Sequence, residues 1–141
     1  MKSKRILILS LAYYPELVAG AEVAIKEITE RVGEDEAVFD MVTLRLNSRL
    51  PTFEKIGNVN VYRIGFTKDN PSAKDLVKFP LYLSKVFYPL LAVWKFWRLD
   101  RKNHYDGIWA MMSYMGMTAV LIRAFVGKIP FVLTVQEGDS F

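Results

Sequence analysis

Short apolar runs alternate along this chain with segments of helical periodicity, and this alternation constrains the fold more than any other feature. The first run, Lys4–Ser10, is apolar without alternation, as expected for a central parallel strand. It precedes an amphipathic segment, Ala21–Val32, in which an apolar stripe lies opposite Glu–Lys and Glu–Arg pairs. Further strands are predicted at Val38–Leu46, Asn58–Ile64, Tyr105–Ala110 and Pro130–Val135, and further helices at Ala73–Arg101 and Met115–Val126. Strands that alternate with helices predict parallel βαβ units.

The connection between the second and third strands departs from this regular pattern. The loop Asn47–Gly57 is too short to hold a crossover helix, so the two strands are either antiparallel or joined irregularly. The third strand alternates cleanly, which places Val59, Val61 and Arg63 on one face and indicates a position near a sheet edge.

The long helical segment contains Pro80 and Pro89, which are expected to kink or split it. The predicted fold is α/β, with a Rossmann-like, mainly parallel sheet of order 3-2-1-4-5 flanked by helices. We expect residues 1–141 to form a single domain.

Composition excludes several classes of site. The chain has no cysteine and a single histidine, His104, so disulfides, zinc–thiolate centres, cysteine nucleophiles and multi-histidine metal sites are excluded. His104 precedes the fourth strand, away from the expected ligand crevice, and is interpreted as structural. The longest uncharged stretch has 16 residues, whereas a transmembrane helix needs about 20 apolar residues. A reducing cytoplasm is the compartment that we expect.

Positive charge is concentrated in one segment. Residues 74–104 contain seven basic and two acidic side chains, a surplus larger than the net charge of +4 for the whole chain. Aromatic residues lie between the cations, which favours an anionic membrane surface as a partner. The residues expected to face it are Lys95, Trp97, Arg98, Arg101 and Lys102. The alternative is an ordinary helix with a basic outer face, and nothing matches a nucleic-acid-binding module.

The loop between the first strand and first helix is a candidate ligand site. Gly20 stands where the helix begins, and free N–H groups at a helix N-terminus suit phosphate or hydroxyl oxygens. The alternative is a glycine cap with no ligand. A dinucleotide fingerprint needs three spaced glycines and an acidic residue after the second strand, and both are missing, which argues against NAD.

Two acidic groups have separate interpretations. Glu22 and Glu30 are spaced E-x7-E on the predicted helix, and we interpret both as solvated charges. The polar residues Gln136, Glu137 and Asp139 follow the fifth strand, where ligands bind in doubly wound sheets, although a plain polar turn is the alternative.

The tyrosine–proline loop, the Ala19-Gly20-Ala21-Glu22 helix start and the Pro130–Asp139 strand and turn resemble one known domain. It is the N-terminal, acceptor-side domain of family-four retaining glycosyltransferases, which have the GT-B fold. In that family a Gly-Gly pair precedes the helix; Gly20 matches the second glycine and Ala19 replaces the first. A histidine often follows the fifth strand, where Gln136 stands here; glutamine binds hydroxyl groups but cannot shuttle a proton.

The resemblance implies transfer of a sugar from a nucleotide sugar to a glycan or lipid-linked acceptor, with no metal or organic cofactor. The implied substrate-binding residues are Tyr13, Tyr14, Ala19, Gly20, Glu22, Gln136, Glu137 and Asp139. Catalytic residues are not identified. The family's nucleotide-sugar-binding domain is absent from these residues, so we expect the isolated chain to be inactive. The alternatives are a binding subunit that needs a separate donor-binding chain, or a membrane-peripheral module at the cytoplasmic face.

Overall fold

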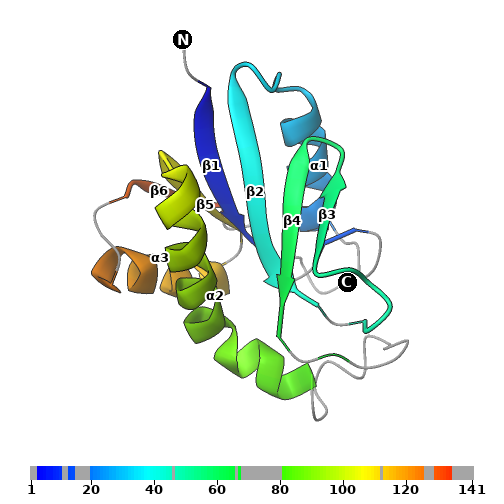
Figure 1. The fold of residues 1–141 in the computed structure, drawn as a ribbon, viewed down its shortest axis with the longest axis vertical. Coiled ribbons are helices and arrows are strands. Elements are labelled where there is room, and N and C mark those ends of the chain that lie inside the picture. The colour runs from blue at the N-terminus through cyan, green and yellow to red at the C-terminus, as the bar shows by residue number, and fades with distance from the viewer. Residues whose placement is uncertain are drawn as a thin grey trace.

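The computed structural model describes residues 3–10, 13–14, 20–45, 47–65, 67, 81–111, 113–125 and 129–134. The strands are β1 (Lys4–Leu9), β2 (Ala37–Leu44), β3 (Phe53–Ile56), β4 (Val59–Ile64), β5 (Gly107–Met111) and β6 (Phe131–Thr134). The helices are α1 (Gly20–Glu30), α2 (Leu81–Asn103) and α3 (Ser113–Phe125). They form an α/β fold in which α2 and α3 cover one face of the sheet and α1 covers the other (Figure 1).

The six strands have the order β3-β4-β2-β1-β5-β6, and all neighbours are parallel except β3 and β4. The predicted order 3-2-1-4-5 is therefore confirmed, with one additional edge strand. This strand, β3, lies in the segment that the sequence analysis assigned to a loop. It carries the chain back along the sheet, and a turn at Gly57, with φ of 58°, then starts β4 parallel to β2. The antiparallel alternative for these two strands was wrong, and the irregular connection is what the structure has.

The expected split at Pro89 does not occur, because α2 runs unbroken from Leu81 to Asn103. Pro89 is buried, and Tyr88, Ala92 and Phe96 beside it belong to the core under the helix. The Tyr88 hydroxyl also donates a hydrogen bond of 2.6 Å to the carbonyl of Val42 in β2. A proline inside a helix costs about 3 kcal/mol, whereas each large buried side chain contributes about 1.5–3 kcal/mol. Packing on the sheet therefore outweighs the lost helical hydrogen bond. Pro80 lies outside the described residues.

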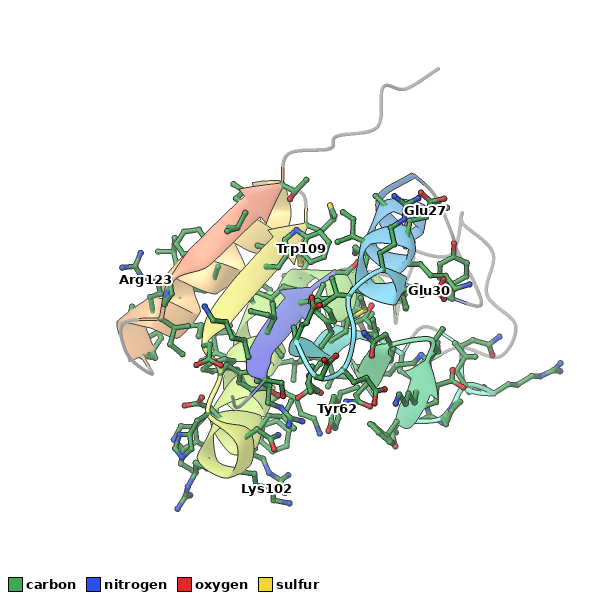
Figure 2. All side chains as sticks on the ribbon, turned by 90° about the horizontal axis from the view of Figure 1, so that it is seen from above. Glu27, Glu30, Tyr62, Lys102, Trp109 and Arg123 are labelled. Carbon is green, nitrogen blue, oxygen red and sulfur yellow. The ribbon has the colours of Figure 1, made fainter. Side chains whose placement is uncertain are left out.

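The two faces of the sheet carry separate cores, because successive strand residues point to opposite sides. Leu7 and Leu9 of β1 pack under α2 and α3, whereas Ile8 between them packs on the α1 side. Among the described residues, the α1 face is less completely covered. An apolar hollow of about 430 Å³ lies there, and Trp109 of β5 is on this face, toward α1 (Figure 2).

A buried polar cluster joins three strands to the segment after α2. The Asp40 carboxylate in β2 is fully buried and accepts hydrogen bonds from Arg5 Nε (3.0 Å), Asn60 Nδ2 (2.9 Å) and the Tyr105 hydroxyl (2.6 Å). Arg5 Nη2 also lies 3.0 Å from the same carboxylate. Burial, reinforced by the bond to Asp40, raises the pKa of Tyr105 well above its usual value, so the hydroxyl remains a donor.

Candidate functional site

The candidate ligand crevice lies at the sheet edge where the parallel strands end. Leu9 at the end of β1 is opposite Ala110 in β5, and Ala110 is opposite Leu133 in β6. Two strand spacings of about 4.8 Å separate β1 from β6, so the loops that follow them start about 10 Å apart. Their bases are therefore within reach of one ligand. Gln136, Glu137 and Asp139 themselves lie outside the described residues, and their role remains a prediction.

Two helices begin at this same edge. Helix α1 starts at Gly20, after β1, and α3 starts at Ser113, after β5. Unpaired N–H groups and the positive end of the helix dipole make each N-terminus favourable for an anion or a hydroxyl oxygen. Gly20 is exposed, and a Cβ atom built on it would meet none of the described residues within 4 Å, so they leave the backbone at the helix start accessible. Ala19 lies outside the described residues.

Tyr13 and Tyr14 follow β1 and pack beside α1. Their rings meet edge to face, with centroids 5.2 Å apart. Tyr13 is buried in the core on the α1 side. Burial raises the pKa of Tyr13, and Tyr14 and the nearby Glu30 raise it further. The Tyr13 hydroxyl is consequently protonated at neutral pH and can act as a hydrogen-bond donor but not as a base.

The interpretation of Glu22 as a solvated charge was wrong. Glu22, in the first turn of α1, is only 6% exposed. Lys26 pairs instead with Glu30, at 3.5 Å, on the outer side of the helix. Glu30 is exposed, as expected, and lies with Glu27 along α1 in Figure 2. Glu22 therefore brings a buried carboxylate next to the open helix start.

Arg63 is a positioning residue that the sequence analysis did not connect with the site. It is 4% exposed, and its guanidinium donates to the carbonyl of Tyr14 at 3.0 Å, to the carbonyl of Pro51 at 3.1 Å and to Glu54 at 2.6 Å. These bonds join the tyrosine loop to the β3–β4 hairpin. The predicted placement of Arg63 on one face with Val59 and Val61 is confirmed, and that alternation was the available signal.

The residues expected to face a membrane all lie on α2 but not in one environment. Trp97, Arg98, Arg101 and Lys102 are exposed, whereas Lys95 is half-buried with its ammonium 5.2 Å from the Tyr62 ring centroid. Arg98 stacks over Trp94 at 5.0 Å and Arg101 over Trp97 at 4.8 Å. Whether this surface meets a membrane remains a prediction. None of the helices in the described part of the chain is long and apolar enough to span a bilayer.

No cluster of three or more metal-ligating side chains occurs within the described ranges. His104 follows α2 and is exposed, at the opposite end of the strands from the helix start at Gly20. The groups that the described residues bring to the edge at Gly20 are N–H donors at the helix start and the acceptor carboxylate of Glu22.

Neither a protein-family model nor a curated protein matches the sequence. Solved structures, however, match it over nearly its whole length. Sucrose-phosphate synthase from Thermosynechococcus elongatus aligns with 95% of this chain at a TM-score of 0.66 and 14% identity. An α,α-trehalose-phosphate synthase (UDP-forming) from Burkholderia xenovorans, in complex with glucose-6-phosphate, aligns with 93% of this chain at a TM-score of 0.57 and 17% identity. A structure described as trehalose-6-phosphate from E. coli bound with UDP-2-fluoro glucose aligns with 94% of this chain at a TM-score of 0.59 and 15% identity.

The chain has the fold of these proteins. It spans about a third of the length of each, since 33% of each of those chains is covered. The Rossmann-like α/β fold expected from the resemblance to GT-B glycosyltransferases is therefore confirmed.

Proposed function

We propose that this chain is the acceptor-binding domain of a retaining glycosyltransferase, which transfers a sugar from a nucleotide sugar to a glycan or lipid-linked acceptor. The shared fold with sugar-phosphate synthases supports this assignment. The observation that carries it is the exposed start of α1 at Gly20, at the same edge of the sheet as the end of β6. Ligands of doubly wound sheets bind at this edge.

The groups at this edge of the sheet have separate roles in the proposed acceptor binding. First-turn N–H groups of α1 bind a phosphate or hydroxyl oxygen. Arg63 holds the tyrosine loop in place. Stabilisation of the leaving diphosphate requires a separate donor site. The chain alone is therefore expected to bind an acceptor without transferring sugar to it.

The test introduces a carboxylate at the helix start. Gly20→Asp has room for its side chain, and an acidic residue in the first turn favours the helix, so folding is retained. The new charge repels an anionic acceptor, and binding of glucose 6-phosphate should weaken about tenfold, equivalent to about 1.4 kcal/mol. Isothermal titration of the 141-residue chain with glucose 6-phosphate, and separately with UDP-glucose, measures this.

The matched control is Ile28→Asp, which adds the same charge to an exposed position near the other end of the same helix. Its affinity should stay within about twofold of the unmodified chain. Equal weakening by both substitutions would show a general charge effect and would remove the site at Gly20. Sugar transfer by the 141-residue chain alone would contradict the assigned division between acceptor and donor domains. A binding subunit that works with a separate donor-binding chain would recover transfer only when that chain is added.

A second candidate function, a membrane-peripheral module at the cytoplasmic face, is favoured by one observation. Helix α2 exposes Phe87, Leu90, Trp94 and Trp97 at helical spacing on the side opposite its buried residues. Arg98 and Arg101 stack on the two tryptophans. Exposed aromatic rings beside cations are typical of helices that lie in a lipid interface.

A further inference from the structure

A second hollow, of about 280 Å³, lies beside α2, away from the proposed acceptor site. Its walls come from β1, β4 and the C-terminal half of α2: Arg5, Tyr62, Lys95, Arg98, Leu99, Lys102 and Asn103. Arg5 is near the start of β1 and Asn103 is the last residue of α2, so the hollow extends toward the opposite edge of the sheet from Gly20. Tyr62 and Lys102 both lie on the side away from α1 (Figure 2).

Four of the seven lining residues are cations, and none is acidic. The nearby Asp40 carboxylate is already occupied by Arg5, Asn60 and Tyr105. Within the described part of the chain, Lys95, Arg98 and Lys102 form no ion pair with a carboxylate. Three cations thus surround one space without a counterion among these residues.

The cations are close enough to destabilise one another. Burial lowers the pKa of Lys95, and repulsion from Arg98 and Lys102 lowers it further. A bound anion would remove this repulsion and raise the pKa of Lys95 toward the usual 10.5 of a lysine. Tyr62 and Asn103 add a hydroxyl and an amide to the walls. The hollow thus offers several donors to one anion.

We infer that this hollow is a binding site for a phosphate group. An arginine guanidinium and two lysine ammonium groups match the several oxygens of a phosphate, which accepts bonds from more directions than a carboxylate. The phosphate can belong to a small soluble molecule or to a lipid headgroup, since both present the same oxygens. The site does not depend on the proposed acceptor site, because it shares no lining residue with the first turn of α1.

The experiment uses the full chain and inorganic pyrophosphate, with titration calorimetry for affinity and side-chain NMR for the Lys95 pKa. Lys95→Gln and Lys102→Gln should each weaken binding about fivefold, and pyrophosphate should raise the Lys95 pKa. Arg123→Gln is the matched control. Arg123 is an exposed cation on a different helix, α3, and it also stacks on an aromatic ring, that of Phe131. It should leave affinity unchanged. Thermal unfolding checks that every variant is folded.

Vesicle binding distinguishes the two sources of phosphate. If pyrophosphate binds and both Lys95→Gln and Lys102→Gln weaken its binding, the site accepts small soluble phosphates. If only phosphatidylglycerol vesicles bind, phosphatidylcholine vesicles do not, and Lys95→Gln reduces that binding, the site takes headgroups. Absence of both kinds of binding, or binding that is insensitive to Lys95→Gln and Lys102→Gln, would overturn the inference. Gly20→Asp should leave the affinity for pyrophosphate unchanged. A negative result for the hollow is therefore distinguishable from a negative result for the acceptor site.

Discussion

At the scale of single residues, Asp40 shows most clearly how this fold handles a buried charge. It occupies the middle of β2, where every residue from Phe39 to Leu44 is buried. An unpaired carboxylate there would be very unfavourable, because it would lose its hydration without compensation. Arg5, Asn60 and Tyr105 supply that compensation from three separate parts of the chain. The cluster therefore joins β1, β2, β4 and the segment before β5.

We predict that Asp40→Asn destabilises the fold by about 3 kcal/mol. An amide removes the negative charge and turns N–H groups toward Arg5 or Tyr105, which leaves buried donors without an acceptor. This decrease in the free energy of unfolding is at the lower end of the range for breaking a buried ion pair, because the Arg5 side chain is 28% exposed and remains partly hydrated. Urea unfolding measures the change. Asp35→Asn, in an exposed turn, is the control, and equal midpoints for the two variants would contradict the prediction.

At the scale of elements, sequence periodicity predicted most of the sheet correctly. Apolar runs such as Lys4–Leu9 are long enough to identify a buried strand, and their alternation with helices indicated the parallel βαβ units of the observed sheet. The prediction missed β3, since Phe53–Ile56 is a four-residue, partly exposed edge strand with weak periodicity. Of the kink or split expected at Pro89, the split does not occur, because local propensity does not include the packing of α2 on the sheet.

The end of α2 provides a test of backbone strain. His104 has a φ of 54°, in the left-handed region, and its N–H closes the helix by donating to the Asp100 carbonyl at 3.0 Å. Glycine adopts this conformation without the steric cost of a Cβ atom. We predict that His104→Gly stabilises the protein by about 0.5–1 kcal/mol. His104→Ala keeps the Cβ atom and should give no such gain in thermal unfolding. A similar gain for both would attribute the effect to loss of the imidazole.

At the scale of the whole molecule, the sequence predicted the edge that holds the candidate site but not the contacts that shape it. Gly20 was recognisable because a glycine stood between a strand and a helix. The bond from Arg63 to Tyr14 spans 49 residues, and Glu22 is buried although the sequence pattern placed it on the solvated side of the helix. The cationic hollow likewise combines Arg5 with residues from α2. Such long-range packing has no periodic signal in a single sequence.

The outer surface of α2 exposes several large apolar side chains. Trp94 is 52% exposed and Leu90 61% exposed, although both are large apolar residues on a helix whose other side is buried. Arg98 and Arg101 lie over the two tryptophan rings, so cations and aromatic groups share one surface. This combination defines the orientation in which the molecule would approach an anionic bilayer, with α2 toward the lipid and the sheet behind it.

We therefore predict weak, salt-sensitive binding to anionic vesicles through this surface. Each cation near the headgroups contributes about 1 kcal/mol, and the aromatic rings add a term that salt does not screen. Arg98→Gln with Arg101→Gln should reduce binding mainly at low salt, whereas Trp94→Ser with Trp97→Ser should reduce it at all salt concentrations. Arg123→Gln with Phe125→Ser, an exposed cation and aromatic on α3, is the matched control and should bind normally. Cosedimentation with anionic and neutral vesicles measures these differences. Equal recovery in the supernatant under every condition would leave α2 with an ordinary solvated surface.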